Sequence, residues 1–359
     1  MPIKIGFILL SNSKNPIPST RIAVLNMLPF LRAANFEPHI VFEPEYGNET
    51  PQLDGLMSRI VLEDFQIIYF QKIHGSSAEN LAQQLSVLGI KTVYGVCDLV
   101  NEAMVRATDI TLVVTDYLKS LYPQALQAKI SVVHDGIEHP EHHKISYNPT
   151  YGSRNKPLHA VLVTSSSLDK LPILNSIPNW LKISIVGRYP PAEQILQNLQ
   201  AMRWQFLAKP NTALRIEYLQ FLAHRRIARI AWHPTQVYKI LQQADIGIIP
   251  IDTTATTEQS PPAWQIKSEN RLTMKMCVGL PVIATPIPAY EPVIRQGKNG
   301  FLAHSIREWH DCLDSLRDPL ARKDMGELAR DSVLIKYSKQ EQAKHLIIVL
   351  NQLLLKSSF

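Results

Sequence analysis

The chain has 359 residues, which is enough for about two domains with sizeable hydrophobic cores. Hydrophobic residues make up 45% and charged residues 19% of it, so the composition excludes a disordered chain and a coiled coil. The net charge of +6 favours anionic partners such as nucleotides or phosphates. This charge is too small and too dispersed to indicate nucleic acid binding, and we expect no nucleic acid partner.

The cysteines and the apolar segments indicate the cellular compartment in which the protein is expected. Cys97, Cys277 and Cys312 are odd in number and far apart, so neither a disulfide framework nor a structural zinc site is expected. The first apolar run, residues 5–10, is too short for the core of a signal peptide. The apolar stretch at 346–355 is about half as long as a membrane span. We therefore expect a cytoplasmic protein with at most peripheral membrane contact.

Short β-branched runs alternate with helical patterns along the first part of the chain. Continuous apolar runs separated by helices predict a parallel sheet covered on both faces, with right-handed crossovers. The predicted strands are residues 3–10, 67–70, 92–96, 111–115 and 130–133, and the clearest helices are 77–88 and 101–107.

The pattern is interrupted between residues 136 and 157, where turn-forming residues predominate. It resumes with predicted strands at 160–164, 183–186, 227–231, 246–251 and 282–285, and then becomes helical. We therefore predict a Rossmann-like domain over 1–140, a linker over 141–157 and a second Rossmann-like domain over 158–335. A C-terminal helix over 336–359 is expected to pack back on the first domain. Two such doubly wound layers would face each other across a cleft.

One predicted helix start in the second domain has the residue types of a phosphate site. Ser268 is a favourable N-cap, and Gly279 is a natural residue to end the helix that follows. The first turn carries Lys267, Asn270 and Arg271 beside free backbone N–H groups, where the helix dipole favours negative charge. These residues predict a diphosphate site. An ordinary capped helix with solvated charges is the alternative.

The second domain contains a series of short segments: Ala244-Asp-Ile-Gly-Ile-Ile-Pro, Lys267-Ser-Glu-Asn-Arg, Gly279-Leu-Pro-Val-Ile-Ala-Thr-Pro and Asn299-Gly-Phe-Leu. Together they resemble the donor-binding domain of the family 4 glycosyltransferases, which transfer sugars from nucleotide donors with retention. Pro18-Ser-Thr-Arg and Val133-His-Asp-Gly-Ile are similar to segments of the family's N-terminal domain. The resemblance implies the GT-B fold and a nucleotide-diphosphate sugar donor. It further implies a glycan, lipid-linked or small-molecule acceptor, with no metal or other cofactor.

The chain departs from the family pattern at two positions. Many members have glutamates that contact the donor ribose and sugar where this chain has Met274 and Ile266. Glu269 or Glu258 is a candidate to replace these glutamates and bind the substrate through its carboxylate. Because the two glutamates are missing, an inactive GT-B-like binding protein stays open as an alternative, as does a sugar-nucleotide epimerase or hydrolase.

The start of the first domain offers candidate substrate-binding residues. Ser19 is a possible cap of the first helix, which would leave Thr20 and Arg21 at the mouth of the sheet. Arg21 is then expected to bind an acidic acceptor or the donor phosphates. An ordinary cap with a surface arginine is the alternative.

Three further candidates follow strands of the same domain. Asp98 comes after the strand 92–96, where the resemblance implies the reaction centre, and a carboxylate there would stabilise a cationic sugar or accept a hydroxyl proton. It would alternatively cap the next helix. Gln71 and Lys72 end the preceding strand and are expected to bind substrate. On the donor side, the resemblance places Lys170 and Arg188 on the diphosphate.

Three other segments receive weaker interpretations. The loop 252–265 is either a mobile active-site loop or a surface loop. The histidines between residues 134 and 143 match no closed metal site in their spacing, so no metal site is predicted. The basic run 224–232 is interpreted as a strand with an adjoining basic turn rather than as a membrane patch.

Overall fold

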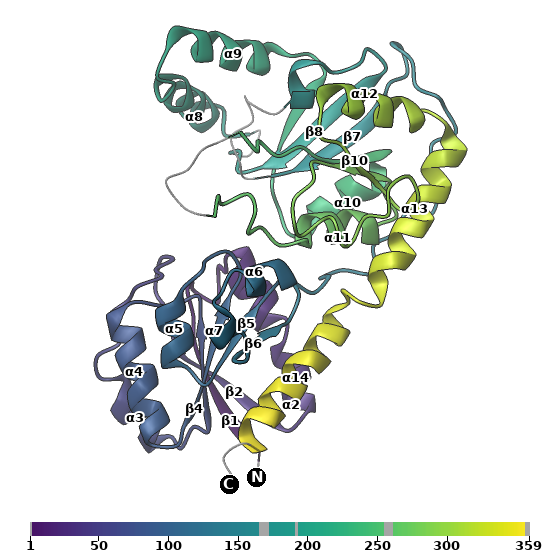
Figure 1. Cartoon of the computed structure of the whole chain (residues 1–359). Coiled ribbons are helices and arrows are strands. Elements are labelled where there is room, and N and C mark those ends of the chain that lie inside the picture. Colours follow the sequence, from purple (N-terminus) through teal and green to yellow (C-terminus); the bar gives the residue numbers. More distant parts are fainter. Residues whose placement is uncertain (1, 165–171, 191–192, 255–260, 356–359) are drawn as a thin grey trace. The chain divides into compact units, whose positions relative to one another are not determined.

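The computed structural model describes residues 2–164, 172–190, 193–254 and 261–355, and the chain divides into two compact units (Figure 1). Unit 1 comprises Met1–Glu138, Gln259–Asn270 and Ile335–Phe359. Unit 2 comprises His139–Glu258 and Arg271–Leu334. Each unit contains its own six-stranded parallel sheet, so the predicted class of two doubly wound α/β layers is confirmed.

The sheet of unit 1 has the strand order β2-β1-β3-β4-β5-β6, and all of its neighbouring pairs are parallel. The strands are β1 (Ile3–Ile8), β2 (Phe36–Phe42), β3 (Ile67–Gln71), β4 (Lys91–Val96), β5 (Ile110–Val113) and β6 (Ile130–Val132). The strand order reverses between β1 and β3. In doubly wound sheets this reversal opens a crevice at the carboxyl ends of the strands, where ligands bind.

Two apolar cores cover the faces of this sheet, because alternate strand residues point to opposite sides. The helices of unit 1 are α1 (Pro18–Thr20), the π-helix η1 (Arg21–Leu25), α2 (Leu28–Ala33), α3 (Leu56–Leu62), α4 (Ser76–Val87), α5 (Glu102–Ala107), α6 (Asp116–Ser120), α7 (Gln124–Gln127) and α14 (Lys339–Leu355). α14 lies beside α2, and its buried Leu346, Leu350 and Leu353 complete the core on the side of β1 and β3 (Figure 1).

The sheet of unit 2 has the order β12-β11-β10-β7-β8-β9. Its strands are β7 (Leu158–Val163), β8 (Leu181–Gly187), β9 (Ile227–Ala231), β10 (Ile246–Ile249), β11 (Val282–Ala284) and β12 (Phe301–Leu302). Numbered within the unit, the order is 3-2-1-4-5-6, which is the order of dinucleotide-binding Rossmann sheets. Its helices are η2 (Pro172–Asn175, 3-10), α8 (Ile195–Leu207), α9 (Thr212–Ala223), α10 (Gln236–Gln243), α11 (Asn270–Cys277), α12 (Ile306–Ser315) and α13 (Pro319–Leu334).

The segment predicted as a linker, 141–157, has no helix or strand, but it is fixed to unit 2. The buried guanidinium of Arg322 donates to the carbonyls of Asn148 and Thr150, at 2.7 and 2.6 Å. The Lys144 ammonium donates to the carbonyl of Ala244, and the Tyr147 hydroxyl to that of Gly279. This coil is therefore a packed part of unit 2 rather than a free connection.

Two local predictions are corrected at helix starts. Ser19 does not cap the first helix, because Pro18 takes the first helical position and Ile17 precedes it without a side-chain cap. The helix α11 begins at Asn270, and Ser268 uses its hydroxyl elsewhere. Its predicted end is confirmed, since Gly279 adopts φ 89° just after it.

Candidate functional site

A pocket lies at the carboxyl edge of the unit 1 sheet. Its lining comes from α1 and η1 and from the ends of β3, β4, β5 and β6, and includes Ser19, Gln71, Lys72, Cys97 and Asp135. The enclosed space of about 40 Å³ holds a few water-sized groups, so it fits the tip of a ligand rather than a whole sugar ring. The position agrees with the crevice expected where the strand order reverses.

Gln71 presents an unpartnered donor in this pocket. Its side-chain oxygen accepts from the backbone amide of Leu10 at 3.1 Å and from the Thr20 hydroxyl at 2.9 Å. Thr20 in turn accepts from the Ser11 hydroxyl at 2.9 Å. These bonds fix the orientation of the amide, and its buried Nε2 has no partner among the described residues. Thr20, predicted to bind substrate, is fully buried and instead positions Gln71.

Lys72 and Asp98 form an ion pair next to the pocket. The Lys72 ammonium lies 2.6 Å from Asp98 and 3.0 Å from Glu49, and its backbone adopts φ 56°, which is uncommon outside glycine. Burial lowers the pKa of Lys72, but Cys97 and these two carboxylates outweigh this and raise it, so the lysine stays charged. Asp98 is half-exposed and accepts from the Cys97 thiol. It does not cap the next helix, since Asn101 does.

Asp135 is a buried acid at the same edge of the sheet. Burial, together with the nearby carboxylates of Glu269, Glu138 and Asp98, raises its pKa to about 6, against the lowering effect of the Ser268 hydroxyl. That hydroxyl donates to Asp135 at 2.6 Å, which explains why Ser268 does not cap α11. Asp135 therefore exchanges a proton close to neutral pH.

Glu269 is also buried, with 2% of its surface exposed. His134 Nδ1 lies 2.7 Å from one carboxylate oxygen and 2.9 Å from the carbonyl of Val114. The contact with His134 does not have hydrogen-bond geometry, and no described residue donates a hydrogen bond to either carboxylate oxygen of Glu269. A buried carboxylate with spare acceptor capacity is costly unless a ligand or water donates to it.

The segment around these acids is bound to unit 1. Ile266, at a position where the family has a glutamate, packs in the core of unit 1, and Gln265 accepts from Tyr117 at 2.9 Å. Residues 259–270 therefore cluster with unit 1, although the sequence placed them in the second domain. Met274, at the other family position, is half-buried in α11.

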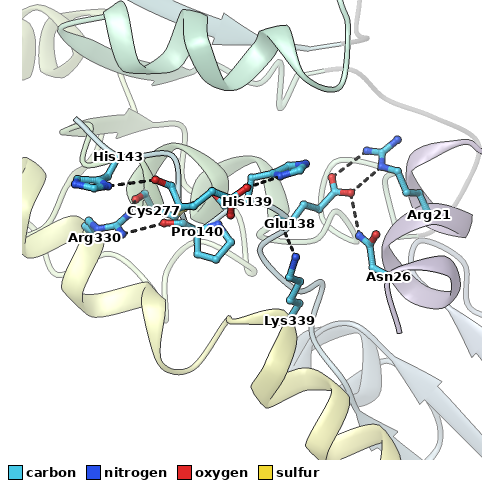
Figure 2. Close-up of polar contacts among 10 residues, drawn as sticks. Arg21, Asn26, Glu138, His139, Pro140, His143, Cys277, Arg330 and Lys339 are labelled. Atoms are coloured by element: carbon cyan, nitrogen blue, oxygen red, sulfur yellow. Dashed lines mark hydrogen bonds and ion pairs between the residues drawn. The ribbon is translucent and has the colours of Figure 1, made fainter. Parts of the chain in front are cut away.

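Arg21 is engaged within unit 1. Its guanidinium binds the Glu138 carboxylate through two hydrogen bonds, at 2.7 and 3.0 Å, and Asn26 donates to the same carboxylate (Figure 2). The Lys339 ammonium donates to the backbone carbonyl of Glu138 (Figure 2). A bidentate pair of this kind competes with the predicted role of Arg21 in binding an external anion.

The predicted phosphate residues are distributed along the start of α11. Lys267, Ser268 and Asn270 belong to unit 1, whereas Arg271 begins the next segment of unit 2. Arg188 is exposed directly after β8. Lys170 and Glu258 lie outside the described residues, as do residues 255–260 of the predicted loop.

A buried lysine occurs on α11 that the sequence did not single out. Lys275 is fully buried, and its ammonium donates to the carbonyl of Arg271 at 3.2 Å. Burial and the Arg271 charge lower its pKa to about 7. Asp135 was noted only as part of a motif, and His134 only in that motif and in the rejected histidine cluster, although both directly follow β6 and the end of a strand marks a candidate site.

Solved structures of glycosyltransferases share this architecture over the whole chain. The chain aligns with Anabaena HepE in complex with UDP and glucose at TM-score 0.66 and 13% identity, over 97% of this chain and 99% of HepE. It aligns with a Rickettsia africae glycosyltransferase at TM-score 0.67 and 12% identity, covering 98% and 99% of the two chains. The fold is GT-B.

Sucrose-phosphate synthase from Thermosynechococcus elongatus has the same GT-B fold, at TM-score 0.66 and 11% identity over 99% of this chain and 100% of that one. No protein-family model and no curated protein sequence matches the chain. Among the described residues, no helix is both long enough and apolar enough to cross a membrane.

Proposed function

We propose that the protein is a glycosyltransferase that moves a sugar from a nucleotide-sugar donor, of the UDP-sugar type, to a hydroxyl-bearing acceptor. The fold is compatible with this activity but does not decide it, since one fold hosts many activities. The observation that carries the proposal is the unit 1 pocket at the carboxyl edge of the sheet, which is lined by the oriented amide donor of Gln71 and the buried acid Asp135, with the ion-paired carboxylate of Asp98 beside it.

The pocket matches an acceptor hydroxyl. A hydroxyl both donates and accepts, so it can accept from Gln71 Nε2 while it donates to a carboxylate. An acceptor lacking that hydroxyl would leave the buried amide unpaired, which is costly and therefore gives specificity. The small enclosed volume favours recognition of one hydroxyl or hydroxymethyl group of a larger glycan, lipid-linked or small-molecule acceptor.

Asp98 is the carboxylate that we assign to the reaction. Its side chain is half-exposed, so it is accessible to a reacting sugar. Its negative charge would stabilise the positive charge that develops on the sugar ring, or take the hydroxyl proton of the acceptor. Lys72 holds the side chain in place. Retention of the anomeric configuration is part of the proposal and is supported by the family resemblance alone.

The donor is assigned to the start of α11. Arg271 and Lys267 flank the first turn, where the positive end of the helix dipole favours a diphosphate. Arg188 after β8 would add a further cation. The Glu269 carboxylate, with its unused acceptor capacity, would accept from donor hydroxyls in place of the missing family glutamates. In this proposal the leaving diphosphate is neutralised by these groups, and transfer needs no metal.

A pair of variants tests the assignment of Asp98. Asp98→Asn should lower kcat for transfer at least about hundredfold, as expected for loss of a charge used in the reaction, while UDP affinity stays unchanged. Glu63→Gln is the matched control, because Glu63 is an exposed carboxylate at the end of α3, at the opposite edge of the sheet. Equal activity of Asp98→Asn and wild type would refute the role of Asp98.

The other activities appear as distinct results in the same assay. An inactive binding protein would bind UDP and release none from UDP-sugars. An epimerase would interconvert nucleotide sugars without releasing UDP, and a hydrolase would release free sugar irrespective of acceptor.

A cytoplasmic location belongs to the same proposal, and it is supported by the three cysteines, none of which is in a disulfide.

A further inference from the structure

A cluster of metal-ligand side chains occurs at the first residues of unit 2, outside the pocket described above. His139, Glu141 and His142 each offer one ligand atom, and these atoms all lie within 4.8 Å of one another. One carboxylate oxygen of Glu141 is 2.9 Å from His139 Nδ1. No metal site was predicted here from the sequence, because the spacing of these residues matches no closed zinc site.

An aromatic ring orients both imidazoles. Tyr238, buried on α10, meets the ring of His139 edge-on, with centroids 4.8 Å apart. The ring of His142 stacks on the same tyrosine at 5.4 Å. Both rings are thereby restricted before any ion arrives, which reduces the ordering that metal binding must impose.

The backbone of the turn is fixed as well. The amide of His142 donates to the carbonyl of His139 at 3.2 Å, closing the turn around Pro140. The Arg330 guanidinium donates to the carbonyl of Pro140 at 2.9 Å and also to that of Cys277 (Figure 2). The turn that carries the ligands is therefore held by Arg330 of α13, which also binds the end of α11 within unit 2.

The chemistry of the three groups selects a class of ion. Two imidazole nitrogens and one carboxylate oxygen suit divalent zinc, copper or nickel better than calcium or magnesium, which prefer oxygen ligands alone. A glutamate carboxylate is ordinarily ionised at neutral pH, as ligation requires.

We propose that this turn binds one zinc ion through His139, Glu141 and His142, with water in the remaining position. Three protein ligands and an open position are a common zinc arrangement. The ion would replace the hydrogen bond between His139 and Glu141 and fix residues 139–142, where the chain passes from unit 1 to unit 2. The site is separate from the pocket of unit 1, so the proposal is independent of the glycosyl transfer reaction.

Zinc titration of the full chain after chelator treatment tests the proposal. Isothermal titration calorimetry should show one saturable zinc per chain, and cobalt in its place should give the visible absorption of a low-coordinate nitrogen and oxygen site. His142→Ala and Glu141→Ala should each weaken zinc binding by at least about tenfold, since even residues behind the ligands cost that much. His143→Ala is the matched control, because His143 is an exposed neighbour outside the cluster.

Three results would overturn the proposal. One is the absence of saturable binding below millimolar zinc, and another is binding that persists in a His139→Ala, His142→Ala double variant. The third is equal weakening by His143→Ala, which would indicate an adventitious ion only, held by surface histidines. UDP binding by the same variants serves as a folding check, and because it should be unchanged, failure of the zinc site leaves the proposed transferase function untouched.

Discussion

Replacement of Asp135 by asparagine should make unit 1 more stable at neutral pH. The folded protein raises the pKa of this acid from 3.8 to about 6 because it is buried among other carboxylates. The folded state then binds more protons than the unfolded state between these pH values, so stability falls as pH rises through this window. A shift of about 2 units corresponds to about 3 kcal/mol, which is lost in full above pH 6.

The asparagine variant removes the charge but keeps an oxygen that can accept from Ser268. We expect variant and wild type to be equally stable near pH 4, and the variant to gain up to about 3 kcal/mol near pH 7. Hydrogen exchange in increasing urea, followed on peptides from β3 and β4, reports unfolding of unit 1. Asp54→Asn, at an exposed turn of the same unit, is the control. A difference independent of pH, or a less stable variant at pH 7, would refute this reasoning.

Three further substitutions test other parts of the account. Lys275→Met should stabilise unit 2 by up to about 5 kcal/mol at pH 6, because the folded state lowers the pKa of this lysine from 10.5 to about 7. The gain should shrink as pH rises from 7 to 10.5, and a pH-independent gain in urea unfolding would contradict it. Arg322→Met leaves four backbone carbonyls without their donor, so it should lower the free energy of unfolding of unit 2 by about 3 kcal/mol. Limited proteolysis within 141–157 should become faster, and unchanged cleavage would show that other contacts hold this segment. Arg271→Ala should weaken UDP binding by about tenfold to a hundredfold and leave uridine binding unchanged, as measured by calorimetry. Equal weakening of both ligands would remove Arg271 from the diphosphate.

The buried strands were predictable because their signal is local. β3, β4, β10 and β11 are continuous apolar runs, and their observed bounds differ from the predicted ones by a residue or two. The edge strand β2 was not predicted, since its middle residues are only half-buried and include Pro38 and His39. The two-residue strand β12 is too short for any periodicity.

The position of the candidate site residues at the sheet edge was predictable from the sequence, but their hydrogen-bond and ion-pair partners were not. Gln71, Lys72 and Asp98 follow strands and were placed correctly at the sheet edge from order alone. The partners of Asp135 and Glu269 were not visible, because Ser268 and His134 are more than a hundred residues away from them in the chain. The hydrogen bonds from Arg322 to the backbone of residues 148–150 could not be predicted for the same reason.

The central claim is transfer of a sugar from a nucleotide donor, and one measurement tests it directly. UDP-glucose and related UDP-sugars are incubated with the protein and a panel of glycan, lipid-linked and small hydroxyl-bearing acceptors. Released UDP is quantified, and the acceptor is analysed by mass spectrometry. The account predicts UDP release that depends on an acceptor, together with an acceptor heavier by one sugar residue. UDP release that yields only free sugar, or saturable UDP binding with no release from any pair, would contradict it.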